Sequence, residues 1–270
     1  MQNFKAKKVI ITGAGSGMGR HLAYQLAAEG AEVFITDINQ QTLNETAQEI
    51  IAKGGRCKTY LVDSASQQQI YEFRDKFLAE EKHLDVLFNN AGIALGEIPL
   101  LEVKEEHLKH IMDVNLWGVI HFTRAFLPAM LTRPEAHLIN TSSVFGIIGV
   151  ETQVPYCTTK FAVRGFTEAL RMELTGTRVA VSCVHPGGIK TNITRNGIHY
   201  QDAEKVHAQF DEIAITTPED AARIIISGVK KNKRKILVGI DAKLIDKIAR
   251  LFPVKYSDLF RWLHERYFKK

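Results

Sequence analysis

The stretch Lys8-Val-Ile-Ile-Thr-Gly-Ala-Gly-Ser-Gly-Met-Gly19 decides the fold that this chain is expected to adopt. Its first five residues are typical of a buried strand, and an amphipathic stretch over residues 20–30 follows the glycines. Glycines permit a tight turn and let backbone N–H groups approach a pyrophosphate at the positive end of the next helix. The stretch therefore predicts strand, loop and helix with a dinucleotide at the loop. An ordinary glycine-rich turn is the simpler alternative.

A second apolar stretch supplies an acidic residue at the expected distance from this loop. Residues 32–36 end at Asp37, twenty positions after the third glycine, where such folds place the group that hydrogen-bonds the adenosine ribose. A carboxylate there repels a 2′-phosphate. Neither Ser16 in the loop nor Ile38 and Asn39 after the aspartate offers a cation to that phosphate. The sequence therefore predicts NAD rather than NADP.

Apolar strands alternate with amphipathic stretches along most of the chain. The strands are expected near residues 8–12, 32–36, 58–62, 85–89, 137–141, 178–184 and 236–239. This alternation predicts an α/β fold: a Rossmann-type, doubly wound, mostly parallel seven-stranded sheet with helices on both faces and ligands at the carboxyl ends of the strands. A chain of 270 residues with 45% hydrophobic content suits one catalytic domain, residues 1–240, followed by a C-terminal amphipathic helical extension, residues 241–270.

A tyrosine and a lysine stand in an arrangement that suits acid/base chemistry. Tyr156 lies thirteen residues after Ser143, and Lys160 follows four residues later. On a helix, residues four apart share a face, so both side chains would reach into one cleft. A free tyrosine has a pKa near ~10, and an adjacent cation favours the phenolate. The spacing predicts proton transfer to or from an alcohol oxygen, with the Ser143 hydroxyl polarising that oxygen.

These motifs together resemble the short-chain dehydrogenase/reductase family, in its compact single-domain branch, over about residues 5–240. The residues after Thr12 resemble its cofactor loop, and Asn89-Asn90-Ala91-Gly92 resembles its strand-four motif. The resemblance implies a catalytic tetrad of Asn115, Ser143, Tyr156 and Lys160. In this tetrad Asn115, inside a long helix, would hold a water that relays the proton.

The resemblance also implies a set of cofactor-binding residues. Within it, Asp63 contacts the adenine, Lys160 also reaches the ribose hydroxyls, and the loop around Pro186 and Gly187 holds the nicotinamide carboxamide. The full set is Gly13, Ser16, Gly17, Met18, Gly19, Asp37, Asp63, Ser64, Asn90, Ala91, Gly92, Tyr156, Lys160, Pro186, Gly187, Ile189 and Thr191.

The predicted function is an NAD-dependent oxidoreductase that transfers a hydride between nicotinamide and a secondary alcohol or ketone. Residues 192–215 would form a lid over the substrate, with the apolar residues Ile193, Ile198, Tyr200, Val206 and Phe210 interspersed. The expected walls of the pocket are apolar as well, which favours a lipophilic substrate. The wall residues are Ala94, Leu95, Phe145, Val150, Val154 and Ile189. Two alternatives stay open: a non-catalytic dinucleotide sensor, and an epimerase or dehydratase that uses NAD transiently.

The last forty residues carry the positive charge of the protein. Residues 230–270 contain 13 Lys and Arg against 4 Asp and Glu, a net charge of +9 within a chain whose total is +5. Two amphipathic helices are expected there. The first has Leu244, Ile245, Ile248, Leu251 and Phe252 on one face, and the second, after Pro253, has Leu259, Phe260, Leu263 and Tyr267, with Trp262 nearby. Packing on the protein's own core or on a partner subunit is the preferred interpretation, and contact with an anionic membrane surface is the alternative. Nucleic acid is not expected.

Partners, location and metals follow from the remaining patterns. The resemblance implies a homodimer or homotetramer. Apolar residues that could serve the core or such an interface are Ile111, Leu116, Trp117, Ile120, Phe122, Phe126 and Phe166.

No signal peptide or long apolar stretch is seen, so a cytoplasmic protein, membrane-associated only through its tail, is expected. The histidines and the three single cysteines show no metal-ligand spacing, so no metal is expected.

Overall fold

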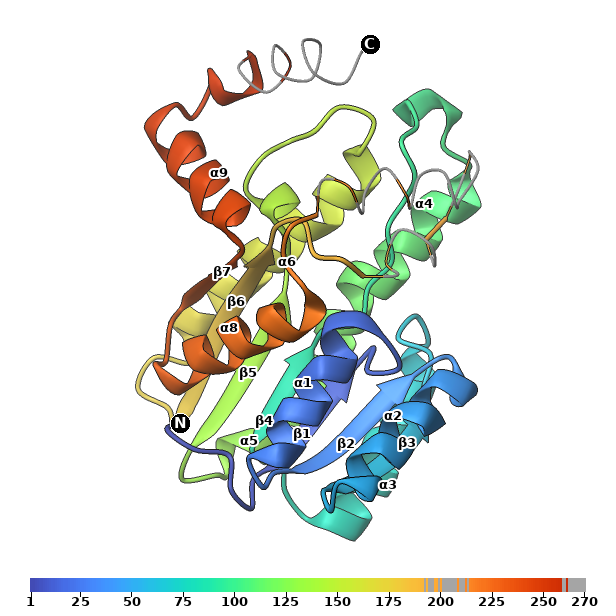
Figure 1. The fold of residues 1–270 in the computed structure, drawn as a ribbon, viewed down its shortest axis with the longest axis vertical. Coiled ribbons are helices and arrows are strands. Elements are labelled where there is room, and N and C mark those ends of the chain that lie inside the picture. Colours follow the sequence, from blue (N-terminus) through green and yellow to red (C-terminus); the bar gives the residue numbers. More distant parts are fainter. Residues whose placement is uncertain are drawn as a thin grey trace.

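Seven strands form one sheet in the computed structural model, which describes residues 1–191, 193, 197–198, 200, 208, 212, 214–258 and 261. The strand order is β3-β2-β1-β4-β5-β6-β7, and each neighbouring pair is parallel (Figure 1). The strands are β1 Lys8–Thr12, β2 Glu32–Asp37, β3 Arg56–Leu61, β4 Val86–Asn89, β5 Ala136–Thr141, β6 Val179–Pro186 and β7 Lys235–Val238. The predicted doubly wound α/β fold is confirmed, and each expected strand range overlaps one of these strands.

Helices cover both faces of the sheet. One face carries α1 (Gly17–Ala28), α2 (Gln40–Ala52) and α8 (Pro218–Lys230), whose apolar residues share a core cluster. The other face carries α3 (Gln67–Glu81), α5 (Gly118–Leu131) and α6 (Val154–Glu173). Beyond the carboxyl ends of the strands lie α4 (Glu105–Met112), α9 (Ile240–Leu251) and the 3₁₀ turns η1 (Leu100–Glu102) and η3 (Val144–Gly146) (Figure 1).

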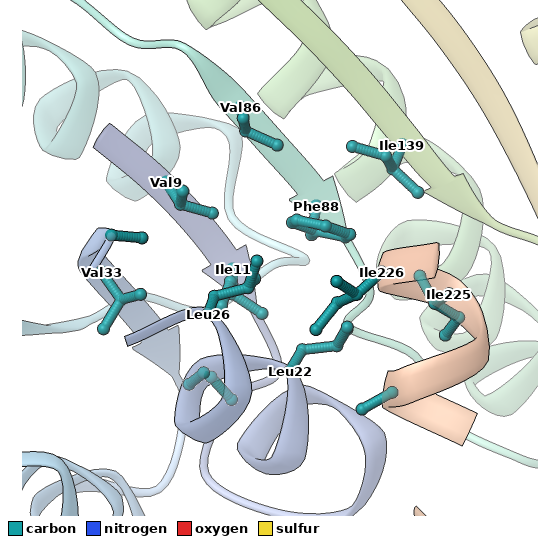
Figure 2. Packing of buried hydrophobic residues seen from close by; sticks show 14 of the residues in the cluster. Val9, Ile11, Leu22, Leu26, Val33, Val86, Phe88, Ile139, Ile225 and Ile226 are labelled. Atoms are coloured by element: carbon teal, nitrogen blue, oxygen red, sulfur yellow. The ribbon is translucent and has the colours of Figure 1, made fainter. Parts of the chain in front are cut away.

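The core follows the two-residue period of the strands. Val9 and Ile11 of β1 point to the face that α1 and α8 cover, and Ile10 points to the opposite face. Figure 2 shows the first side, where Leu22 of α1 and Ile226 of α8 converge on β1. Both faces of each central strand are thus buried, which explains why these strands are apolar without alternation.

The order of the strands reverses between β1 and β4, and hydrogen bonds join the loops that follow these two strands. The Thr12 hydroxyl accepts hydrogen bonds from the backbone N–H groups of Asn90 (3.0 Å) and Ala91 (2.9 Å). Gly13 has φ +65°, and a Cβ there would lie 2.8 Å from the Ala91 Cα. Only glycine lets the two loops approach in this way. In doubly wound folds the crevice at such a point binds the ligand.

Buried amide and hydroxyl groups tie the strands to the helices behind them. The Asn89 amide nitrogen donates to the Asn140 oxygen (2.9 Å) and the Thr123 hydroxyl (3.0 Å). Asn140 in turn donates to the Thr167 hydroxyl at 3.0 Å. Because unpaired polar groups are costly in the interior, this network fixes α6 at one depth and rotation on the sheet.

The first helix of the C-terminal extension exists as α9, and its predicted apolar face packs only in part on the chain's own core. Ala242 and Asp246 are the buried residues, and Asp246 pairs with Lys235 of β7 and with Arg250 at 3.3 Å. Ile245 and Ile248 are half-buried, whereas Leu244, Leu251 and Phe252 are exposed. The inward side of the helix thus carries an ion pair with the edge strand, and contact of the exposed apolar residues with a partner subunit or a membrane surface stays a prediction. The predicted second helix lies almost entirely outside the described residues.

Two histidines are buried in the sheet without charge. His137 of β5 hydrogen-bonds the Ser182 hydroxyl through Nε2 at 2.8 Å, and burial lowers its pKa to about 4. His185 of β6 bonds the Ser143 carbonyl through Nδ1 at 3.0 Å, and burial likewise lowers its pKa to about 4. In the unfolded chain both imidazoles would titrate near ~6.5.

The free energy of unfolding should therefore fall as pH drops from about 6.5 towards 4, because the unfolded chain then binds protons that the two folded imidazoles refuse. Each histidine contributes a slope of up to about 1.4 kcal/mol per pH unit. Urea unfolding between pH 4.5 and 7.5 measures it. His137→Gln should lower this slope by close to 1.4 kcal/mol per pH unit relative to the same change at the exposed His110, which is the matched control. Equal slopes for both variants would contradict the assignment.

Candidate functional site

Tyr156 and Lys160 lie on the first turns of α6, beside the carboxyl end of β5. The Lys160 ammonium is 5.5 Å from the centre of the Tyr156 ring and donates to the Thr141 carbonyl at 3.3 Å. Ser143 is the second residue after the end of β5, and its hydroxyl accepts from the Phe145 N–H at 3.1 Å to begin η3. The Phe145 ring meets the Tyr156 ring edge to face, with centroids 6.0 Å apart. The predicted phenol, ammonium and hydroxyl are thus brought together.

Burial controls the protonation of this pair. It raises the pKa of Tyr156 to about 12, and a hydrogen bond with Ser143 opposes the rise. It lowers the pKa of Lys160 to about 8, so the ammonium still carries most of its proton at pH 7. Burial, rather than the adjacent ammonium, is thus the largest influence on the pKa of Tyr156 in the cofactor-free protein, and the spacing of the two residues did not predict it.

Asn115 is fully buried and its amide fixes the loop after β4. It lies in a π-helical turn, η2 (Asp113–Trp117), that joins α4 to α5. Its oxygen accepts from the Ile93 N–H (2.8 Å), and its nitrogen donates to the Ile93 carbonyl (2.9 Å). Gly92, in the same loop, has no side chain, and a Cβ there would sit 3.3 Å from the Lys160 Nζ. The predicted long helix is continuous from α4 through η2 to α5, but the spacing of its residues did not predict the π turn. Such turns are frequent at functional sites.

The glycine loop and the start of α1 fit a pyrophosphate. Gly17 has φ +51°, and Ser16, the residue that precedes α1, makes no capping bond with its side chain. The first turn of α1 contains no acidic residue. Its backbone donors and positive dipole therefore suit an anion. Asp37, at the end of β2, accepts from the Gly15 N–H at 2.8 Å, and its carboxylate keeps lone pairs for further donors.

The loop after β6 closes the other side of the crevice. The Gly187 N–H donates to the Val238 carbonyl at 2.9 Å, and Ile189 pairs with Thr216. Thr191 reaches the glycine loop, since a Cβ on Gly17 would lie 3.2 Å from its side chain. The sequence-predicted residues of the glycine loop and of the nicotinamide loop are thus neighbours in space. Asp63 and Ser64 follow β3 and precede α3, at the same edge of the sheet.

Arg20 is a charged residue of this region that the sequence analysis did not single out. Its Nε donates to the Gly15 carbonyl at 2.9 Å, and its Nη2 lies 3.2 Å from a Glu45 carboxylate oxygen. The available signal was its position, four residues after Ser16 and hence one turn into the helix. Arg20 thus places a cation beside the loop that Asp37 contacts, and this cation pairs with the Glu45 carboxylate.

An apolar cluster packs against Tyr156. Leu95 and Ile98 are buried, with Ile198 and Tyr200 of the predicted lid packed against them. The Tyr200 hydroxyl accepts from the Lys104 N–H at 2.9 Å and lies 2.7 Å from His107 Nδ1. Ile189 is buried and Val154 is exposed. Val206 and Phe210, also assigned to the lid, lie outside the described residues.

Within residues 1–191 and 214–258 and the few described positions between and after them, no three His, Cys, Asp or Glu side chains are grouped so that they could hold a metal ion. None of the helices described is both long and apolar enough to cross a membrane.

The comparisons with known proteins agree with this geometry. Residues 7–201 match the family model for short chain dehydrogenases. The chain is 39% identical over 265 residues to SadH of Mycobacterium tuberculosis, covering 96% of this chain and 95% of that protein. It is 33% identical to 17-beta-hydroxysteroid dehydrogenase 13 of Mus musculus, over 85% of this chain and 73% of that one.

A solved short-chain dehydrogenase/reductase from Burkholderia phymatum in complex with NAD superposes with a TM-score of 0.84, at 25% identity and 97% coverage of both chains. Other solved neighbours carry NADP. The chain belongs to the short-chain dehydrogenase/reductase family of oxidoreductases.

Proposed function

We propose that this protein is an NAD-dependent oxidoreductase that interconverts a lipophilic secondary alcohol and its ketone. The observation that carries the proposal is the meeting of Tyr156, Lys160 and Ser143 at the sheet edge where the glycine loop also ends. A bound dinucleotide would supply the hydride acceptor or donor. The residues that would hold it are those of the glycine loop, Asp37, the β4 loop and the loop after Pro186.

Each polar side chain has a definable task in this reaction. The neutral phenol of Tyr156 donates a proton to a carbonyl oxygen, and in the reverse direction its phenolate takes the proton from an alcohol. Ser143 holds the same oxygen by a hydrogen bond. Lys160 supplies a positive charge next to the phenol, which favours the phenolate when the alcohol is oxidised. Asn115 holds the β4 loop against this group, and its turn is the place where a relay water would bind.

The preference for NAD rests on Asp37. Its carboxylate lies against the loop at Gly15 and would repel a 2′-phosphate while accepting ribose hydroxyls. Arg20 is the one opposing feature near this loop among the residues described, and its pairing with Glu45 reduces its availability to a phosphate.

The preference for a lipophilic substrate rests on the apolar cluster beside Tyr156. Tyr156 packs against the cluster that contains Leu95 and Ile98, and the Phe145 ring contacts its ring edge to face. Burying an apolar ligand against such a surface contributes about 25 cal/mol per Å². A relative that bears the name of a hydroxysteroid dehydrogenase is consistent with this substrate class.

Turnover on a panel of secondary alcohols tests the proposal, with NADH formation from NAD⁺ measured by absorbance. Medium-chain, steroid-like and retinoid-like alcohols should react, and small polar ones should not. Tyr156→Phe should lower kcat by about 10²- to 10⁴-fold because the proton donor is lost. Tyr60→Phe is the matched control: it removes a phenol hydroxyl from the outermost strand β3, where that hydroxyl lies 3.4 Å from a Glu80 carboxylate oxygen, and it should react at the wild-type rate.

The outcomes separate the alternatives. Faster turnover with NADP⁺ than with NAD⁺ would overturn the cofactor assignment alone. Tight NADH binding without turnover on any alcohol would favour the dinucleotide sensor, and conversion of a substrate without net NADH formation would favour an epimerase or dehydratase.

We further propose that the protein forms a homodimer through the surface of α6 and η2. Trp117 in η2 is 47% exposed and Phe161 in α6 is 40% exposed, and these two elements are in contact. Exposed aromatic side chains on adjacent elements are typical of protein interfaces. Ile111, Phe122 and Phe126, also considered for an interface, are fully buried and serve the core.

A second surface, on α9, suits an anionic lipid surface. Ile240, Leu244 and Leu251 recur at helical spacing on its outer side and are 56% to 74% exposed. Lys243 and Lys247, on the same side of the helix, are exposed as well. Exposed apolar residues flanked by lysines match an interfacial helix, and the net charge of +9 over residues 230–270 complements anionic headgroups.

A substitution in one surface should change vesicle binding alone, and a substitution in the other should change the oligomeric state alone. Leu244→Ser should lower co-sedimentation with phosphatidylglycerol-containing vesicles at least threefold and leave the mass in light scattering unchanged. Phe161→Ser should shift the mass towards the monomer and leave vesicle binding unchanged. Neutral phosphatidylcholine vesicles should bind more weakly than anionic ones. Equal vesicle binding by Leu244→Ser and wild type would contradict the lipid surface, and a monomeric wild type would contradict the dimer.

A further inference from the structure

The first turn of α9 inserts a carboxylate under the loop that follows β6. The Asp241 Oδ2 accepts a hydrogen bond from the Gly188 N–H at 2.6 Å, across 53 residues of sequence. Gly188 lies between Pro186 and Ile189, in the loop assigned above to the nicotinamide carboxamide. A residue of the C-terminal extension thus directly contacts the backbone of the candidate cofactor site.

Glycines make room for this carboxylate on two sides. A Cβ on Gly187 would overlap both carboxylate oxygens of Asp241, and a Cβ on Gly239 would overlap Oδ1. Gly239 has φ +104°, a backbone conformation that L side chains rarely adopt, and it turns the chain from β7 into α9. The absence of side chains at Gly187 and Gly239 is therefore required for Asp241 to reach the loop.

The extension touches the opposite wall of the site too. The Tyr256 hydroxyl accepts from the Gly149 N–H at 3.1 Å, in the segment between η3 and α6. That segment connects Phe145 to Tyr156. The residues after β7 therefore contact both the cofactor side and the substrate side of the crevice.

We propose that Asp241 is a positioning residue, which holds the loop of residues 187–189 in the conformation that binds the nicotinamide end of the dinucleotide. This inference rests on the proposed function of that loop. Asp241 is the acidic residue in the first turn of α9, where a carboxylate also favours the helix. Its Oδ1 is buried without a hydrogen-bond partner among the described residues, so the bond between Oδ2 and the Gly188 N–H is the contact that ties this carboxylate to the loop.

Asp241→Ala and Asp246→Ala form a matched pair for testing this role. Both remove a carboxylate from α9, but Asp246 pairs with Lys235 and Arg250 and does not contact the loop. In the cofactor-free protein, amide exchange of Gly188 should be at least tenfold faster in Asp241→Ala than in wild type, and unchanged in Asp246→Ala. The dissociation constant for NADH, from fluorescence titration, should rise about tenfold in Asp241→Ala and less than twofold in Asp246→Ala.

The conservative variant Asp241→Asn keeps an acceptor oxygen and should retain part of the protection and of the affinity. It also serves as the test if the alanine variant does not fold. Wild-type exchange at Gly188 in both Asp241 variants, or equal NADH affinity for wild type and Asp241→Ala, would overturn the inference. A wild type that binds no NADH would instead overturn the proposed function, while the exchange measurement would still report on the contact.

Discussion

The burial of one ammonium group is the constraint on which the site depends. Lys160 is 3% exposed, and a charge placed there costs several kcal/mol unless polar groups surround it. The carboxyl end of β5 supplies the Thr141 carbonyl, and the glycine at position 92 lets the β4 loop approach the same nitrogen. The same burial that lowers the pKa of Lys160 raises that of Tyr156, so the pair is held as a neutral acid beside a cation.

The fold explains how this arrangement is kept rigid. The chain of side-chain bonds from Asn89 through Asn140 to Thr167 fixes α6, which carries both members of the pair. Asn115 fixes the β4 loop from a π turn, and His185 holds the carbonyl of Ser143. The parallel sheet brings these residues to one edge because each strand ends there, and the reversal of strand order opens the crevice at that edge.

Much of this was predictable from the sequence because it depends on local patterns. The strands, the glycine loop and the helical spacing of Tyr156 and Lys160 each follow from residues close together in the chain. The π turn at Asn115 was not predictable, because local spacing does not distinguish it from an ordinary helical turn, and the Asn115 amide bonds Ile93, 22 residues away in sequence. The same holds for Asp241, whose partner is 53 residues distant. The inward side of α9 was not predictable from apolar spacing, because it carries Asp246, which pairs with Lys235 of β7. The pKa of Tyr156 depends on burial, which spacing does not report.

The most direct test of the buried pair is a titration of Tyr156 by NMR of protein labelled with ¹³C at the tyrosine Cζ, with Tyr156→Phe providing the assignment. The free protein should show a Tyr156 signal that does not shift up to pH 10.5, because burial raises its pKa to about 12. Addition of NAD⁺ should bring the titration below pH 10 if the pair is the acid/base centre of a dehydrogenase. A Tyr156 signal that titrates near pH 10 in the free protein, or one that NAD⁺ leaves unchanged, would contradict this account.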